Sequence, residues 1–231
     1  MLRISSLLFL MIFALGAKAQ TCSPTASYIL ANGEEATEAD AQSAPVQAHF
    51  EANPSGVGDY SARYEWRIYE PGKENAPIVH RFEETLDYTF TQSGNFLVQC
   101  YATFVLGTDT IAYPEEGEEQ PFSVSITESR LEMPNAFSPN GDEFNPIYKA
   151  KSTHQSIVEF KATIFNRWGQ RLYTWTDING GWDGTYKGKR VPDGVYFVNV
   201  TARGADGHVY HIRKDVNVMT YKDETGGSNE Q

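Results

Sequence analysis

The sequence predicts an all-β protein with two antiparallel β-sandwich domains in tandem behind a signal peptide. Short runs of β-branched and aromatic residues alternate apolar and polar side chains, as half-buried strands do. Turn signals built from Gly, Pro, Asn and Asp separate these runs at short intervals. The chain of 231 residues also exceeds the length of a typical single domain, and its charge is divided unevenly.

A secretory leader opens the chain. Arg3 supplies the positive charge, Leu7–Leu15 is a short apolar run, and residues 17–19 (Ala-Lys-Ala) place small residues before a cleavage site. The apolar run is shorter than the roughly 20 residues that a membrane-spanning helix needs. Residues 1–19 are therefore predicted to be a signal peptide. The mature chain is expected to pass through the periplasm and to be secreted or held at the cell surface.

Charge divides the mature chain into two parts. Residues 20–130 carry 18 acidic and 5 basic residues, a net charge of −13, whereas residues 131–231 carry 12 of each. This contrast favours one domain over 20–130 and a second over 131–219, followed by a polar tail over 220–231. An acidic domain repels polyanions, which argues against nucleic acid as a partner. The alternative role of the acidic residues is to keep a secreted protein soluble.

Cys22 and Cys100 are the only cysteines. In an oxidising compartment an even pair predicts a disulfide, which would stabilise the first domain by about 3–5 kcal/mol. The alternative is acylation of Cys22 after cleavage of the leader. A lipobox needs a Leu-like residue three positions before the cysteine and a small residue directly before it, where this chain has Ala19 and Thr21.

Alternating side chains predict the strands of the first domain. One face of a strand over 45–52 is apolar, and so is one face of a strand over 64–69. Two further strands are predicted within 87–104 around a Ser-Gly turn. The acidic segment Ala31–Gln42 is predicted to be a loop because no apolar residue recurs in it. The expected inward faces are Val46, Ala48 and Phe50; Tyr64, Trp66 and Ile68; and Phe96, Val98, Cys100 and Ala102, with strands also expected over 21–30 and 122–126.

Trp66 and the hairpin after it resemble PKD and related immunoglobulin-like domains. The hairpin reads Tyr-x-Phe-x-x-x-Gly-x-Phe-x-Val over residues 88–98. The resemblance implies an immunoglobulin-like β-sandwich for residues 20–130. The WDFGDG-like segment of PKD domains is absent, since the chain reads RIYE directly after Trp66.

Four turn-rich motifs follow one another in the second domain. They read MPNAFSPNGD at 133–142, IFNRWG at 164–169, GWDG at 181–184 and PDGVYF at 192–197. Gly accepts positive φ, Asp and Asn bond their own backbone, and Pro presets φ, so each motif is suited to a tight turn. In this order the motifs resemble the gliding motility-associated C-terminal domain of Bacteroidetes, the type B sorting domain of the type IX secretion system.

This resemblance implies a β domain over 131–219 that is recognised by the type IX translocon. It also implies an outer-membrane β-barrel partner of the PorP/SprF type. Two positions depart from the family pattern, Glu143 in place of a glycine and Pro146 in place of an acidic residue. The polar tail after the final strand, predicted at Asp215–Met219, leaves open an alternative role as an accessory component of the translocon.

The candidate recognition residues lie in the turns of these motifs: Asn140, Asp142, Arg167, Trp168, Trp182 and Asp183. Trp and Arg dominate the energetics of protein interfaces. The Arg167-Trp168 tip and the Trp182-Asp183 turn are the parts expected to be exposed. The alternative for both tryptophans is packing in the core or at its rim, because aromatic side chains bury a large area.

Two roles are possible for the polar residues in the loop of the first motif. Asn140 and Asp142 are suited to capping a tight turn around Gly141. Alternatively, the side-chain oxygens of Asn140, Asp142, Glu143 and Asn145 are of the type that binds Ca²⁺.

No catalytic motif is recognisable in the sequence. The five histidines show no metal-ligand spacing, and there is no serine nucleophile elbow, HExxH or phosphate-binding glycine loop. The protein is therefore predicted to be non-catalytic and to need no cofactor. A different class of function is a surface adhesin or glycan-binding module, with the first domain binding a surface glycan or protein ligand.

Overall fold

The computed structural model describes residues 20–140 and 145–219. The predicted signal peptide, the loop 141–144 and the tail 220–231 lie outside the described residues. Across the described ranges the chain forms strands, turns and loops without a helix, which confirms the all-β prediction. None of the described segments is a helix long and apolar enough to cross a membrane.

Residues 20–130, called the first unit below, fold into two main sheets, antiparallel apart from the pairing of β4 with β12. One has the order β4-β12-β10-β7-β8, with β11 also paired to β10, and the other has the order β3-β2-β5-β9. A short β1-β6 pair completes the unit. The strands are β1 (Thr21–Cys22), β2 (Thr25–Ile29), β3 (Glu35–Ala36), β4 (Ala39–Gln42), β5 (Val46–Glu51), β6 (Pro54–Ser55), β7 (Ser61–Tyr69), β8 (Val79–Arg81), β9 (Thr85–Phe90), β10 (Gly94–Leu106), β11 (Asp109–Tyr113) and β12 (Phe122–Ile126).

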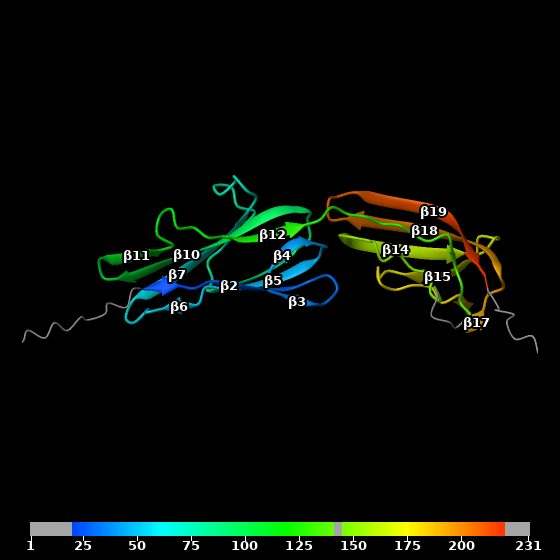
Figure 1. Ribbon diagram of the computed structural model, residues 1–231, viewed down its shortest axis with the longest axis horizontal. Coiled ribbons are helices and arrows are strands. Elements are labelled where there is room, and N and C mark those ends of the chain that lie inside the picture. The colour runs from blue at the N-terminus through cyan, green and yellow to red at the C-terminus, as the bar shows by residue number, and fades with distance from the viewer. Residues whose placement is uncertain (1–19, 141–144, 220–231) are drawn as a thin grey trace, which may run out of the picture.

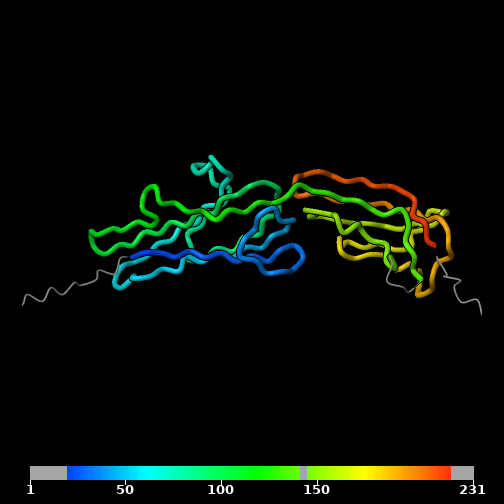
Figure 2. The backbone as a smooth tube through the Cα atoms, in the orientation of Figure 1, coloured from blue at the N-terminus to red at the C-terminus, as the bar shows by residue number. Residues whose placement is uncertain are grey.

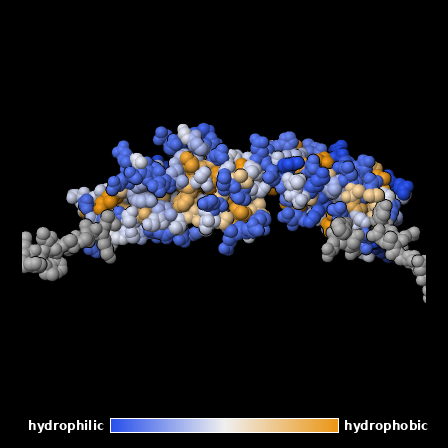
Figure 3. Space-filling view, viewed as in Figure 1, coloured by the Kyte–Doolittle hydropathy of each residue, from blue (hydrophilic) through white to orange (hydrophobic). Residues whose placement is uncertain are grey.

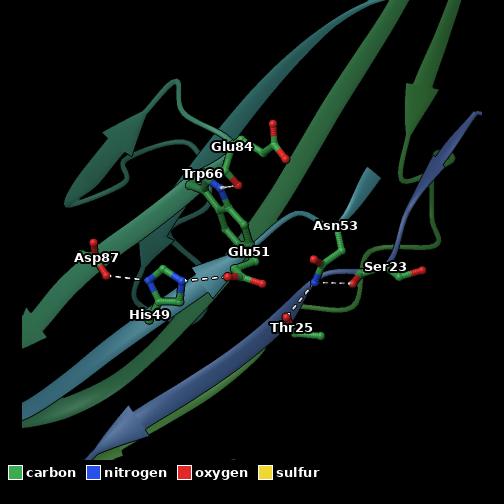
Figure 4. A network of polar contacts seen from close by, with 8 residues as sticks. All are labelled: Ser23, Thr25, His49, Glu51, Asn53, Trp66, Glu84 and Asp87. Carbon is green, nitrogen blue, oxygen red and sulfur yellow. Dashed lines mark hydrogen bonds and ion pairs between the residues drawn. The ribbon is translucent and has the colours of Figure 1, made fainter. Parts of the chain in front are cut away.

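Trp66 is fully buried in the core of this unit, and its ring centroid lies 5.7 Å from that of Phe50 on the facing sheet. Its indole nitrogen donates to the carbonyl oxygen of Glu84 at 3.4 Å (Figure 4). The strands predicted at β5, β7, β10 and β12 are confirmed, and alternating burial along β5, β7 and β10 confirms the inward faces predicted for them. An aromatic-rich sandwich core of this kind supplies most of the hydrophobic stabilisation of the unit.

The prediction of a loop over Ala31–Gln42 is wrong, because the segment contains β3 and β4. Strand β4 runs parallel to β12, with Ala39 opposite Val124, and Ala39 is 1% exposed. Both strands lie at sheet edges and contribute few large apolar side chains, so their acidic sequence shows no alternation.

The predicted Cys22–Cys100 disulfide is not formed in the structure, where both cysteines are free and buried. Burial raises the pKa of Cys22 to about 11 and the pKa of Cys100 to about 12, and a charge on Cys22 adds to the rise at Cys100. Both groups are therefore thiols at neutral pH, and the thiol is the unreactive form.

Residues 131–219, called the second unit below, are built on one sheet of order β13-β19-β18-β14-β15. Its inner face carries Ala162, Ile164, Val198 and Val200, all buried. Loop residues such as Tyr148 and a two-stranded β16-β17 hairpin complete the core. The strands are β13 (Ala136–Phe137), β14 (Ile157–Phe165), β15 (Arg171–Trp175), β16 (Thr185–Tyr186), β17 (Lys189–Arg190), β18 (Gly194–Gly204) and β19 (Val209–Val218), the last of which contains most of the predicted final strand.

The two units lie end to end along the long axis of the molecule (Figures 1 and 2). Strand β14 begins beside the first unit and runs away from it, since Ser156, just before β14, bonds residues of the first unit. The turn after Phe165 therefore lies at the far end of the second unit, called the distal end below. The β16-β17 hairpin is also found there (Figure 1).

Ser156 is the centre of the junction between the units, 1% exposed and with a φ of 47°. Its hydroxyl oxygen accepts from the amide of Ala44 at 3.2 Å and lies 2.9 Å from that of Thr127. Its amide donates to the hydroxyl of Ser43 at 3.0 Å, and its carbonyl accepts from Ala205 at 2.8 Å. Ala205 also belongs to the hydrophobic core of the first unit. These bonds fix the units relative to one another.

Candidate recognition site

Three of the four motifs of the second unit, the first, third and fourth, meet at Trp182, which is fully buried. The Trp182 ring lies 5.4 Å from that of Phe137 in the first motif and 5.5 Å from that of Tyr196 in the fourth, between centroids. Its indole nitrogen donates to the carbonyl of Thr185 at 2.8 Å. Trp182 and Tyr148 also exchange two backbone hydrogen bonds of 2.9 and 2.8 Å. Segments distant in sequence are thereby joined into one rigid base.

Gly184 explains why the third motif ends in glycine. Its φ is +77°, a left-handed conformation that favours glycine. A Cβ at this position would also lie 2.9 Å from the Cγ of Pro139 and 3.4 Å from the Phe137 ring. The first motif can pack against the third only because this side chain is absent.

The second motif forms the exposed tip between β14 and β15. The Asn166 side-chain oxygen accepts hydrogen bonds of 3.0 Å from the amides of both Trp168 and Gln170. The Asn166 carbonyl accepts a further bond from the Gly169 amide at 3.0 Å. Trp168, held by this turn, is 79% exposed. The guanidinium carbon of Arg167 lies 5.0 Å from the centroid of the Trp168 ring, in a cation–π contact.

A hydrogen bond attaches this tip to the rigid base. Gln170 donates from its side-chain nitrogen to the hydroxyl of Tyr186 at 3.1 Å, which ties the tip to β16. Burial raises the pKa of Tyr196, and the positive charge of Arg167 opposes that rise. The Tyr196 hydroxyl donates to the carbonyl of Pro192 at 2.8 Å. The tip is therefore a preorganised surface rather than a free loop.

The structure separates the predicted recognition residues. Arg167 and Trp168 share one exposed tip, so the core alternative for Trp168 is wrong. Trp182 is core, so its predicted exposure is wrong, because Phe137, Tyr148 and Tyr196 enclose it. Asp183 is exposed, but its carboxylate accepts from the amide and hydroxyl of Thr185 at 2.9 and 2.8 Å, as in a local turn.

The loop of the first motif is only partly described. Asn140 is half-buried, whereas Asp142 and Glu143 fall within residues 141–144. Asn145, with a φ of 49°, accepts at its carbonyl from the Ser138 amide at 3.0 Å and so closes the loop. Over residues 20–140 and 145–219, no group of three or more His, Cys, Asp or Glu side chains is placed to hold a metal. Calcium binding at this loop stays a prediction.

Sequence reasoning missed Tyr148 and Tyr186, on which the site depends. Tyr148 is fully buried and donates from its hydroxyl to the carbonyl of Pro134 at 3.1 Å. It lies in irregular chain, where no alternation marks it as core. Tyr186 lies on a strand of two residues, too short to show a pattern.

The fold and the distal end define a class of protein: a tandem β-sandwich chain whose second unit presents an exposed Arg-Trp turn held by hydrogen bonds. Residues 131–212 match the family model of the CHU_C type IX secretion signal domain. This match supports the sorting-domain prediction and recognition by the type IX secretion machinery, which implies export out of the cell.

No curated protein matches this chain. Among solved structures, one similar chain is the "Crystal structure of dimeric latent PorU from Porphyromonas gingivalis", 12% identical over 87% of this chain, with a TM-score of 0.25. This chain covers 20% of that structure's length. A TM-score this low indicates neither a shared fold nor a shared function.

Proposed function

We propose that this protein is a non-catalytic cargo of the type IX secretion system, delivered to the cell surface or released. The second unit is the signal, and the Arg167-Trp168 tip is part of the surface that the machinery reads. The observation that carries the proposal is an exposed Trp–Arg pair on a rigid base, within the segment that matches the secretion signal domain.

The tip has the properties of an interface hot spot. Trp168 contributes a large aromatic surface to solvent rather than to the core, and Arg167 adds a charge above its ring. Since the turn is already held by the hydrogen bonds of Asn166, binding costs little conformational entropy.

The charge of the distal end indicates the kind of partner. Lys187, Lys189 and Arg190 of the β16-β17 hairpin are exposed at the same end as Arg167. These cations favour a partner surface with acidic loops, because complementary charge steers association. An outer-membrane β-barrel of the PorP/SprF type is the proposed partner, and the periplasm is the proposed route to it.

The first unit is proposed to be the passenger, a PKD-like immunoglobulin-like domain. Its alternative role is that of an adhesin for a surface glycan or protein ligand. A role of the whole chain as an accessory component of the translocon is the remaining alternative, favoured by the tail 220–231 after the signal domain.

The test is deletion of residues 131–231, followed by fractionation of cells and medium. Retention of the truncated chain in the periplasm supports the signal role, and unchanged export contradicts it. A companion deletion of residues 220–231 asks whether the tail takes part. Export that survives the second deletion but not the first assigns the signal to the second unit itself.

A further inference from the structure

A cleft of about 250 Å³ opens at the junction of the two units. The first unit lines it with residues of the β2-β3 turn and of the segment before β5, including Leu30, Asn32 and Ser43. The second unit lines it with His154, before β14, and with Ile178 and Asn179, after β15. In Figure 3 the molecular surface narrows between the two units. Sites for small molecules occur preferentially at such boundaries.

The walls of the cleft are fixed before any ligand arrives. Ser156, which lines the cleft, satisfies its amide, carbonyl and hydroxyl within the junction. Its left-handed backbone is a strained conformation for a residue other than glycine. Such strain persists only where the surrounding structure holds it, and it gathers at binding and active sites.

Several polar groups in the cleft have no partner among the described residues. Within the described ranges, the side chains of His154 and Asn179 make no hydrogen bond, and the Asn32 side-chain nitrogen donates none. Ser43 accepts at its hydroxyl oxygen from Ser156, and its hydroxyl proton has no acceptor among the described residues. Amide, hydroxyl and imidazole groups offer both donors and acceptors, which suits a ligand whose own groups do both.

The remaining lining identifies the class of ligand. Leu30, Pro45, Ile157 and Ile178 supply aliphatic surface, and none of the described residues that line the cleft is Asp, Glu, Lys or Arg. A ligand with hydroxyls at its edge and C–H groups on its faces matches both features. The charge of −13 on residues 20–130 disfavours an anionic ligand, and the described lining holds no carboxylate that would form an ion pair with an amine.

We propose that the junction cleft binds one neutral sugar ring, with Asn179, His154 and Asn32 bonding its hydroxyls and Ile157 and Ile178 packing on its face. The volume admits a single ring and excludes a larger ligand from full enclosure. This function is separate from sorting, because the cleft lies at the opposite end of the second unit from the Arg167-Trp168 tip.

The test is titration of the full mature chain with glucose, galactose, mannose and N-acetylglucosamine, observed by NMR. Glucuronate and glucosamine serve as the charged probes. We expect saturable shifts of the Ile157 and Ile178 methyls and of the Asn179 side-chain amide with at least one neutral sugar. The charged probes should leave these signals unchanged.

Asn179→Ala removes an exposed side chain that makes no hydrogen bond to the described residues, so the fold should survive. The affinity of this variant for the sugar should fall about tenfold, which corresponds to the contribution of one hydrogen bond. Asn75→Ala, which removes an exposed amide from the β7-β8 loop outside the cleft, is the matched control and should bind normally.

Three results would overturn the proposal: neutral sugars that leave the cleft signals unchanged, equal binding of the charged probes, or equal loss in both variants. Export should be unaffected by Asn179→Ala in any case, so failure of this proposal is distinguishable from failure of the sorting proposal.

Discussion

The guanidinium of Arg167 lies 5.0 Å from the ring centroid of Trp168, at an exposed turn at the distal end of the protein. Trp182, in the next motif along the chain, is fully buried. The two tryptophans therefore have different environments in one domain. The buried one packs against the first and fourth motifs, and the exposed one faces solvent.

Replacing Trp182 by Ala should destabilise the second unit by about 3–5 kcal/mol, because it leaves a cavity beside the rings of Phe137 and Tyr196 and a carbonyl without its donor. Trp168→Ala is the matched control and should change the free energy of unfolding by less than about 0.5 kcal/mol. Chemical denaturation followed by fluorescence measures both. Similar losses in the two variants would contradict the assignment of core and surface.

Gly204 holds the linker between the units in place. A Cβ at Gly204 would lie 2.1 Å from the Ser129 hydroxyl oxygen, so Gly204→Ala should displace the linker and break the bonds of Ser129 to Asp206. Protection of the Ser129 amide from hydrogen exchange should be lost. Gly207→Ala, in the same turn, strains a backbone with a φ of +81°, but its new Cβ meets nothing within 4 Å. It therefore separates backbone strain from the contact with Ser129, and Ser129 should stay protected. Protection retained in both variants would contradict the close approach.

His49 bonds Asp87 at 2.7 Å and Glu51 at 3.1 Å on the outer face of β5 (Figure 4). These carboxylates raise the pKa of His49 above its ordinary 6.5, so folding favours the protonated ring. The stabilisation is complete below about pH 6.5 and is lost as the pH rises through the folded pKa. NMR titration should show a raised pKa that falls in Asp87→Asn. Asp59→Asn, at an exposed position, is the control. A wild-type value at or below 6.5 would exclude these ion pairs.

The raised pKa values of Cys22 and Cys100, to about 11 and 12, predict slow alkylation of the native protein. Near pH 8 iodoacetamide should label neither thiol in the folded chain and both in denaturant, as mass spectrometry can show. Because burial favours the protonated thiols, their contribution to stability should fall as the pH rises from about 9 toward these values. Two cysteines that resist labelling in denaturant without reductant would show a disulfide and contradict the free thiols.

The strands of the first unit were predictable where burial alternates. The alternation of Val46, Ala48 and Phe50 with polar residues predicts a strand, because one side of β5 faces the core and the other faces water. The edge strand β4 was not predictable, because only Ala39 is buried in it and the polar and acidic residues around Ala39 show no apolar alternation. Pairing with β12, a long-range property, decides its conformation.

The turns of the candidate site were predictable from the sequence, but the positions of their side chains in the core or at the surface were not. Trp168 and Trp182 lie in similar Gly-rich contexts, and only the packing of Phe137 and Tyr196 distinguishes them. The junction was not predictable at all. Ser43, Thr127 and Ser156 are short polar residues without periodicity, and the contacts that join them span more than 100 residues of sequence for Ser43 and Ser156.

We propose above that the secretion machinery recognises the exposed Arg167-Trp168 tip of the second unit during export. The most direct measurement is the fraction of full-length protein outside the cell for Trp168→Ala, compared with Phe82→Ala, which removes a 70%-exposed aromatic from the first unit. We predict that Trp168→Ala accumulates, folded, in the periplasm, whereas Phe82→Ala is exported like the wild type. Export of folded Trp168→Ala at the wild-type level would contradict the claim.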